Sequence, residues 1–231
     1  MMFDELHATA ADRSRIYWML SRFFVEPPSP AFLAELGMAA ETPEAESEPG
    51  LAGALAALRQ SLERADAENL GAEFVRLFRG IQEGYGPPPP YESLHREGRL
   101  MGETTERVVS HYRHQGFETV EESVGPQDHI GAELKYLAFL CHRESAAWER
   151  GETDSGQTTQ AVQRDFLDKH LLRWVPEYCR RVQSDTKVPY FQAVADLTAR
   201  TIEQDFQQIC AGLSDLATGA AEGSKPKGEE Q

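Results

Sequence analysis

The residue types best suited to chemistry are gathered in one short stretch, where Asp128, His129 and Glu133 lie close together. His129 and Glu133 are four residues apart, a spacing that puts two side chains on the same face of a helix. A zinc site needs about three or four such ligands, and His111 and His114 could contribute further ones. The sequence has neither an H-E-x-x-H motif nor a Cys/His cluster. We therefore predict no bound metal, and interpret Asp128 as the N-cap of a helix.

Motifs for catalysis are also absent from the sequence. There is no G-x-S-x-G elbow, no nucleotide-binding P-loop and no G-x-G-x-x-G dinucleotide motif. Asp128 and His129 are adjacent, so on a helix their side chains point about 100° apart and do not naturally form an acid–base pair. We predict that the chain is not an enzyme and carries no cofactor. A metal-dependent enzyme that uses Asp128, His129 and Glu133 is kept as an alternative.

The elements that carry these residues are predicted to be helices. Apolar side chains recur at helical spacing along the chain, and no convincing alternation typical of strands occurs. In the helix that follows Asp128, the predicted core-facing positions are Ile130, Leu134, Leu137 and Cys141. Other helices are predicted near residues 16–24, 32–36, 51–62, 68–79, 104–114 and 166–182, and from Pro189 onward. Pro176 can divide the helix at 166–182.

We predict from this pattern an all-α fold with a single globular helical domain over residues 1–216. Two segments interrupt it, an acidic linker at about 40–50 and a Pro/Gly-rich hinge loop at about 80–102. Residues 151–156 are predicted to form a further loop, and residues 217–231 a disordered tail.

The hinge loop has an unusual composition, reading GIQEGYGPPPPYESL from Gly80 to Leu94. Four consecutive prolines, at 87–90, cannot lie inside a helix and favour an extended polyproline conformation. Many proline-rich loops are plain connections. The functional interpretation is a rigid wall that carries Tyr91 and Glu92 and loses little entropy when a peptide binds beside it.

The overall charge restricts the kinds of partner. The chain carries 23 basic and 38 acidic residues, a formal net charge of −15. Such a charge repels nucleic-acid phosphates and anionic membranes and attracts a basic partner, although it also serves solubility alone. Three scattered cysteines fit a reducing compartment. With no signal-peptide pattern at the N-terminus and no run of ~20 apolar residues, we predict a cytoplasmic protein that neither binds nucleic acid nor inserts directly into membranes.

Three stretches match one known family in order and spacing, and they are RLFRGIQEGYGPPPPYESL, GPQDHIGAELKYLAFL and FLDKHLLRWVPEY. They resemble the TorD/DmsD/NarJ family of redox-enzyme maturation chaperones, and the similarity extends over about residues 10–213. The chain departs from the family before Asp128, where many members have Glu-Pro, and in the proline loop, where a tyrosine replaces the tryptophan of some members. The most specific pieces are Asp128-His129 with Glu133-Leu134, then His170-Leu171 with Trp174, and then Tyr91-Glu92-Ser93.

The resemblance implies an all-helical fold of the TorD-like type without catalytic activity. It implies binding to the twin-arginine signal peptide, or to the unfolded N-terminal region, of a partner molybdopterin-containing catalytic subunit until the cofactor is inserted. It is compatible with a monomer or a domain-swapped dimer, and some members are reported to bind guanine nucleotides. A structural accessory subunit of the mature redox complex is kept as an alternative.

The client-binding residues are predicted from this resemblance and from the chemistry of a basic, partly apolar leader, which needs acidic groups beside an apolar groove. Glu118, Glu121 and Glu122 supply carboxylates near the Asp-His pair, whereas Leu77 and Trp174 are better explained as core. Because Asp128 and His129 stand at a helix start, we expect an exposed rim there. The predicted residues are Phe78, Tyr91, Glu92, Ser93, Asp128, His129 and Glu133.

Overall fold

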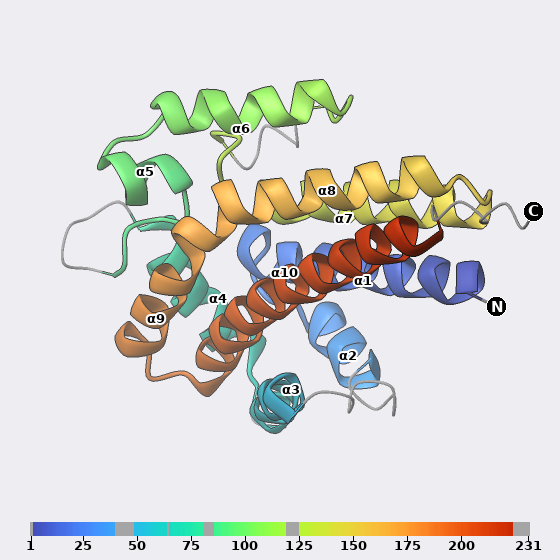
Figure 1. Cartoon of the computed structure of the whole chain (residues 1–231). Helices are drawn as coiled ribbons and strands as arrows, with labels where there is room; N and C mark the ends of the chain where they lie inside the picture. The colour runs from blue at the N-terminus through green and yellow to red at the C-terminus, as the bar shows by residue number, and fades with distance from the viewer. Residues whose placement is uncertain (1, 40–48, 64, 81–85, 119–124, 224–231) are drawn as a thin grey trace, which may run out of the picture.

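The computed structural model describes residues 2–39, 49–63, 65–80, 86–118 and 125–223. Within these ranges all regular secondary structure is helical, as predicted (Figure 1). A π-helical turn, η2, and a 3-10 turn, η4, accompany ten α-helices. The bounds are α1 Met2–Val25, α2 Pro30–Ala39, α3 Pro49–Leu62, α4 Ala67–Phe74, η2 Val75–Arg79, α5 Glu92–Glu97, α6 Glu103–His114, α7 Ile130–Glu149, α8 Thr153–Lys169, η4 Leu171–Arg173, α9 Val175–Asp185 and α10 Pro189–Gly223.

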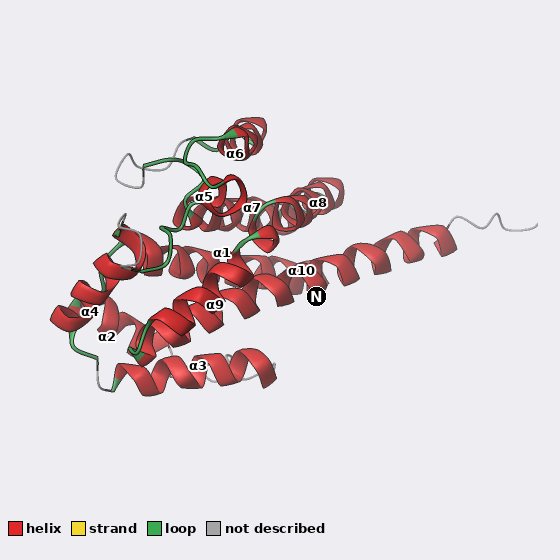
Figure 2. Cartoon of the chain, turned by 90° about the vertical axis from the view of Figure 1, so that its left-hand side faces the viewer, coloured by secondary structure: helices red, strands yellow, loops and turns green. Residues whose placement is uncertain are grey.

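Helix α7 lies at the centre of the packing. Fourteen of its 20 residues are buried, so it contacts other elements on nearly every side. Its most extensive contact among the described elements is with α1, and α8 packs on it as well (Figures 1 and 2). The predicted core face is confirmed, because Ile130, Leu134, Leu137 and Cys141 are all fully buried.

Helix α10 covers the other side of the core, where it packs on α3, α8 and α9. An aromatic cluster joins this side to α1 and to the turn after α4. The ring of Phe78 lies 5.2 Å from the ring of Phe24, 5.2 Å from that of Phe74 and 5.7 Å from that of Phe191. Aromatic rings at such separations bury large apolar areas and attract one another edge to face. This cluster fixes the start of the loop that leads to Tyr91.

Helices α5 and α6 lie at the edge of the molecule. In Figure 1 they are above α8, and in Figure 2 α6 is the outermost helix of that side. The main contact of α6 is with α5, and only one face of α6 is buried, through Thr104, Val108 and Tyr112. The pair forms an outer layer, and α6 is held on α7 and α8 by ring contacts of Tyr112 with Tyr136 and Phe166, at 4.7 and 6.2 Å between ring centres.

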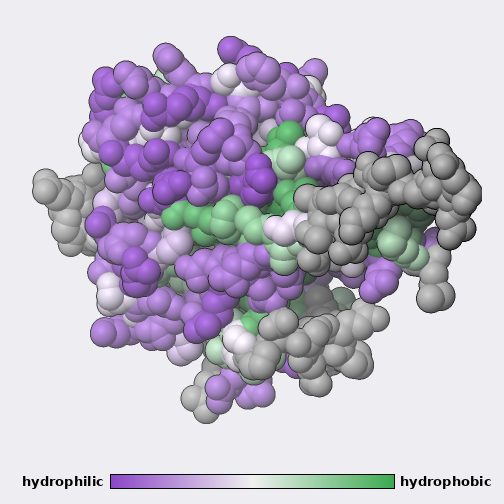
Figure 3. All heavy atoms as spheres, in the orientation of Figure 1, coloured by the Kyte–Doolittle hydropathy of each residue, from purple (hydrophilic) through white to green (hydrophobic). Residues whose placement is uncertain are grey.

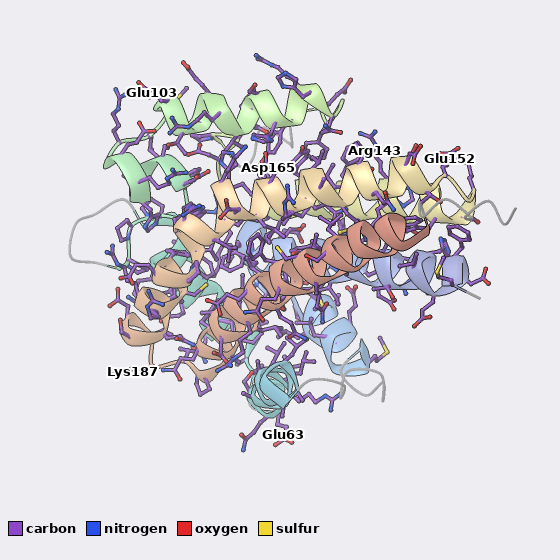
Figure 4. All side chains as sticks on the ribbon, in the orientation of Figure 1. Glu63, Glu103, Arg143, Glu152, Asp165 and Lys187 are labelled. Atoms are coloured by element: carbon purple, nitrogen blue, oxygen red, sulfur yellow. The ribbon has the colours of Figure 1, made fainter. Side chains whose placement is uncertain are left out.

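Hydrophilic residues dominate the face in Figure 3, with a band of hydrophobic residues across its middle. Charged side chains labelled in Figure 4, such as Glu103, Arg143 and Lys187, point away from the helices. Among the described helices, none is long and apolar enough to cross a membrane.

Two predicted loops are partly helical, which corrects the prediction. The link between α7 and α8 is only residues 150–152, where Gly151 takes a φ of 70° and turns the chain, so Gly156 lies inside α8. The hinge loop at 80–102 contains α5, which is buried at Glu92 and Ser93. Both corrections have one cause, because packing against neighbouring helices outweighs the local preference of glycine and proline for loops.

Among the last helices, the division predicted near Pro176 is confirmed and the end of the final helix is corrected. The helix expected at 166–182 is divided before Pro176 by η4, and Pro176 stands in the first turn of α9, where its missing N–H costs nothing. Helix α10 continues to Gly223, so the tail predicted from 217 does not begin there. Most of the predicted acidic linker, at 40–48, and residues 224–231 lie outside the described residues.

Candidate functional site

The starts of α5 and α7 are joined directly, although they are far apart in the sequence. The backbone N–H of Glu92 donates to the carbonyl of Asp128 at 2.9 Å, and the N–H of Ile130 donates to the carbonyl of Pro90 at 2.9 Å. These bonds form an isolated antiparallel bridge between Tyr91 and His129. We call this contact, residues 90–93 with 128–130, the α5–α7 junction. It brings together two of the three sequence stretches that carry the family resemblance, and these two hold all of the predicted site residues.

Asp128 caps a helix, but a different helix from the predicted one. Its Oδ2 accepts from the backbone N–H of Ser93 at 2.8 Å, which satisfies a donor in the first turn of α5. Helix α7 begins two residues later and is capped by His129, whose Nδ1 accepts from the N–H of Gly131 at 3.0 Å. In this arrangement the His129 proton is on Nε2. The prediction of Asp128 as the cap of α7 is therefore wrong by one residue.

Glu92 joins α5 to the end of α8. Its carboxylate accepts from Arg96 one turn further along α5, and from Nδ1 of His170 at 2.8 Å. Arg96 also donates to the backbone carbonyl of Lys169 at 3.0 Å. The carboxylate is fully buried, so two charged or polar partners are needed to offset its loss of water.

Arg96 and His170 belong to this site, although neither is among the residues predicted from the sequence. The spacing of Glu92 and Arg96, four residues with the acid first, is a favourable helical ion pair and could have indicated the first partner. His170 lies in the third stretch that carries the family resemblance, but nothing in its spacing points to Glu92. The same stretch contains Trp174, which is buried as predicted and stacks on His95 of α5 at 5.1 Å between ring centres.

Glu133 lies in the same buried region without an ion-pair partner among the described residues. Neither of its carboxyl oxygens has a hydrogen-bond partner within the part of the chain that the structure describes. Burial raises the pKa of this carboxyl well above its ordinary value, and the negative charges of Glu92 and Asp128 raise it further. Burial and the two neighbouring carboxylates therefore favour the protonated, neutral form of Glu133.

His129 is neutral for a related reason. Burial lowers the pKa of its imidazole to about 3, and the positive charges of Arg79 and Lys135 act in the same direction. Since the imidazole also supplies the cap of α7 through Nδ1, this nitrogen is occupied by a backbone donor. Among the described residues no group of three or more His, Cys, Asp or Glu could hold a metal ion. The alternative of a metal-dependent enzyme built on Asp128, His129 and Glu133 finds no support in this geometry.

The exposed rim predicted at Asp128 and His129 is wrong, because both side chains are buried, and so are four of the other five predicted residues. Tyr91 is the exception; it is half-buried, and its ring meets that of His129 edge-on with 5.0 Å between ring centres. Gly125, whose φ of 73° favours glycine, brings its backbone so near that an added Cβ would lie 3.3 Å from the Tyr91 hydroxyl oxygen. The buried residues are Phe78, Glu92, Ser93, Asp128, His129 and Glu133, each at most 2% exposed.

The arrangement can hold Tyr91 in one orientation. Its backbone is fixed by the bridge to His129, and the helix that follows is fixed at Glu92, Ser93 and Arg96. Residues Glu121 and Glu122, predicted to lie near the Asp-His pair, are outside the described residues. The junction therefore fixes the position of a half-exposed aromatic ring, and its arrangement does not resemble a catalytic centre.

Comparisons with known proteins connect this arrangement to a family. A family model described as nitrate reductase delta subunit matches residues 44–180, more than half of the chain. The chain is 27% identical over 218 residues to the chaperone protein TorD of Vibrio cholerae, covering 88% of this chain and 94% of that one. It is 30% identical over 117 residues to the selenate reductase assembly chaperone protein of Thauera selenatis, covering 51% and 59%.

A solved structure supports the fold. The chain resembles a protein from Archaeoglobus fulgidus, described as a redox enzyme maturation protein, with a TM-score of 0.52 and 23% identity. The match covers 80% of this chain and 91% of the other, so it extends over most of the helical domain.

Proposed function

Because the chain belongs to the nitrate reductase delta subunit family, we propose that it is a cytoplasmic assembly chaperone for a molybdopterin-containing oxidoreductase. The observation that carries this proposal is the similarity to a TorD chaperone over 88% of this chain and 94% of that one. In this role the chain binds the signal peptide or N-terminal region of the catalytic subunit. It keeps that subunit ready for cofactor insertion and assembly before export.

The client contact is proposed at the α5–α7 junction, with Tyr91 as the residue that touches the client. A half-exposed aromatic ring on a rigid backbone gives contact area at little cost in entropy. Glu92, Ser93, Asp128 and His129 are buried, and in this proposal they position Tyr91 and do not touch the client. Phe78 and Glu133 act in the same way from the core beneath. The net charge of −15 favours the approach of a basic leader.

The function is tested in cells that make this chain together with the oxidoreductase whose catalytic subunit it serves in this proposal. Deleting the chain is expected to leave that subunit present but poor in molybdenum, and a plasmid copy is expected to restore the metal. The readout is molybdenum per purified catalytic subunit, measured by elemental analysis. An unchanged molybdenum content in the deletion strain would show that the chain is not an assembly factor. Recovery of the chain in equal amount with the active reductase would instead favour an accessory subunit.

The contact is tested with the leader peptide of the same catalytic subunit. Tyr91→Ala is expected to weaken its binding on the order of tenfold, which corresponds to about 1.4 kcal/mol. Tyr91→Phe keeps the ring and should bind nearly as well. Phe206→Ala removes another half-buried ring, on α10, and serves as the control. Equal affinity of Tyr91→Ala and Phe206→Ala in calorimetry would exclude Tyr91 as the contact.

A further inference from the structure

The end of the proline loop is held by a side chain of α5, the imidazole of His95. Its Nε2 donates to the backbone carbonyl of Pro89 at 3.2 Å. The backbone N–H of Tyr91 donates to the same carbonyl at 2.8 Å. This second bond closes a three-residue γ-turn centred on Pro90, whose fixed φ suits that position. His95 is therefore bonded directly to the turn that sets the direction of the chain at Tyr91.

Two aromatic rings from the start of α9 fix the imidazole of His95 in turn. The ring of Trp174 stacks on it, with 5.1 Å between ring centres and 23° between the planes. The ring of Tyr178 meets it edge-on at 5.0 Å and 67°. Trp174 and Tyr178 are four residues apart, a spacing that places both rings on the same side of a helix, and both are buried. Ring pairs at such separations attract one another, so His95 has one preferred orientation.

His95 acts as a neutral hydrogen-bond donor. Burial lowers the pKa of its imidazole to about 4, although the hydrogen bond to Pro89 opposes the shift. A neutral imidazole carries a single N–H, and because the carbonyl of Pro89 can only accept, this proton is on Nε2. The bond to the loop is therefore made without a buried charge.

These contacts connect the first and the third of the three stretches that carry the family resemblance. Pro89 and Tyr91 belong to the first stretch, and Trp174 and Tyr178 belong to the third. His95 lies one residue beyond the end of the first stretch and is the link between them. The α5–α7 junction joins the first stretch to the second. All three stretches thus act on the backbone at Tyr91.

We propose that His95 is a positioning residue, which holds Tyr91 in the orientation that the client meets. Trp174 and Tyr178 act through it by keeping its ring in place. This role rests on the proposed function in taking Tyr91 as the client contact. It goes beyond that function because it gives the third stretch a task that the contact itself does not explain. A contact residue whose backbone is already ordered loses less entropy on binding, so loosening the turn at 89–91 weakens binding without removing a contact.

The first test measures the turn in the free protein. His95→Phe keeps an aromatic ring against α9 but removes the N–H donor, whereas His95→Gln keeps an N–H at about the position of Nε2. Hydrogen exchange of the Tyr91 amide, followed by NMR, is expected to be about fivefold faster in His95→Phe and close to the wild-type rate in His95→Gln. His7→Phe is the control, because His7 is also partly buried and hydrogen-bonded, to Ser145 near the other end of α7, and should leave this amide unchanged.

The second test is a double-mutant cycle with the leader peptide of the catalytic subunit. His95→Phe is expected to weaken leader binding about fivefold in the wild-type background, the scale of one lost hydrogen bond. In the Tyr91→Ala background it should change the affinity less than about twofold, because no ring remains to be positioned. A general loss of folding would instead lower the affinity by the same factor in both backgrounds.

Two results would overturn the proposal. One is an unchanged exchange rate of the Tyr91 amide in His95→Phe, which would show that the turn does not need this donor. The other is an equal loss of leader affinity in the two backgrounds, or in His95→Phe and His7→Phe. A leader peptide that fails to bind the wild-type protein would contradict the proposed function, and the exchange rates would still show whether His95 holds Tyr91.

Discussion

The protonation of Glu133 makes the free energy of unfolding of the chain depend on pH. Its pKa is above the ordinary 4.5 in the folded protein because of burial and the nearby charges of Glu92 and Asp128. Below pH 4.5 the carboxyl is neutral in both the folded and the unfolded chain. Above this pH the unfolded chain releases the proton and the folded chain keeps it, so the free energy of unfolding falls as pH rises.

Replacing Glu133 by glutamine should remove this dependence. Glutamine has nearly the same shape and does not ionise, so Glu133→Gln should gain stability relative to the wild type as pH rises above 4.5. The expected slope of the difference is up to about 1.4 kcal/mol per pH unit, until the folded carboxyl itself ionises. Urea unfolding of both proteins between pH 4 and 8 measures it. Parallel stability curves would show that Glu133 ionises normally in the folded state.

Asp128 allows a second prediction at this scale. Asp128→Ala removes the acceptor of the buried Ser93 N–H, and leaving such a donor unpaired costs about 1–3 kcal/mol. Asp128→Asn keeps an acceptor oxygen at the same place and should lose less. The free energies of unfolding of the two variants, measured at one pH, show whether the acceptor oxygen is what Asp128 contributes to stability. If the asparagine variant is as unstable as the alanine variant, the cap of α5 is not what Asp128 contributes.

The sequence predicted a capping role for Asp128 but could not identify the helix that it caps. Capping patterns are read from neighbours within about three residues, so they favour the helix that follows directly. Ser93 lies 35 residues earlier and meets Asp128 only in the folded chain. The same limit applies to the burial of His129, since helix starts are usually near water and this one is covered by the proline loop. Tertiary contacts, which local sequence patterns do not contain, determine both the helix that Asp128 caps and the burial of His129.

The helices themselves were largely predictable, because apolar spacing reports which face is buried. The face of α7 and the start of α10 at Pro189 agree with the structure. Errors occurred where packing outweighs local preference. The sequence predicts Gly156 in a loop, yet it lies inside α8. A Cβ added there would lie 2.6 Å from the Trp148 ring, so glycine lets α8 approach α7 closely. Glycine inside a helix can thus indicate close packing as well as a helix end.

A pair of glycine substitutions tests this interpretation of α8. Gly156→Ala forces a methyl group onto the buried Trp148 ring and should cost about 1–3 kcal/mol, the usual effect of overpacking. Gly71→Ala lies inside α4, where an added Cβ meets nothing within 4 Å, and should gain up to about 1 kcal/mol from helix propensity. Thermal unfolding of both variants shows whether each substitution raises or lowers the stability of the protein. A stabilising Gly156→Ala would show that α7 and α8 can separate without loss.

At the scale of the whole molecule, one largely buried arginine, whose side chain is 12% exposed, connects four helices. Arg13 of α1 donates to Glu144 of α7 at 2.8 Å, to Gln163 of α8 at 2.5 Å and to Asp205 of α10 at 2.5 and 3.0 Å. Tyr17 adds a further bond to Asp205 at 2.5 Å. The contributing residues are separated by up to 192 positions in the sequence, so no local pattern predicts the network. It ties α10 to the central pair α1 and α7.

The last prediction concerns this network. Arg13→Met preserves much of the side-chain length but leaves Glu144 and Asp205 buried without their cation, and breaking a buried pair in this way costs about 3–5 kcal/mol. Arg200→Met removes an arginine from an exposed pair with Asp196 and should cost at most about 1 kcal/mol.

Urea unfolding measures the loss, and hydrogen exchange locates it. Amides of α10 should exchange faster in Arg13→Met than in Arg200→Met, because α10 loses a link to α1 and α7. If the two variants are equally stable, the carboxylates of Glu144 and Asp205 must be held by their remaining donors. Gln160, Gln163 and Trp148 for Glu144, and Tyr17 for Asp205, would then be sufficient without the arginine.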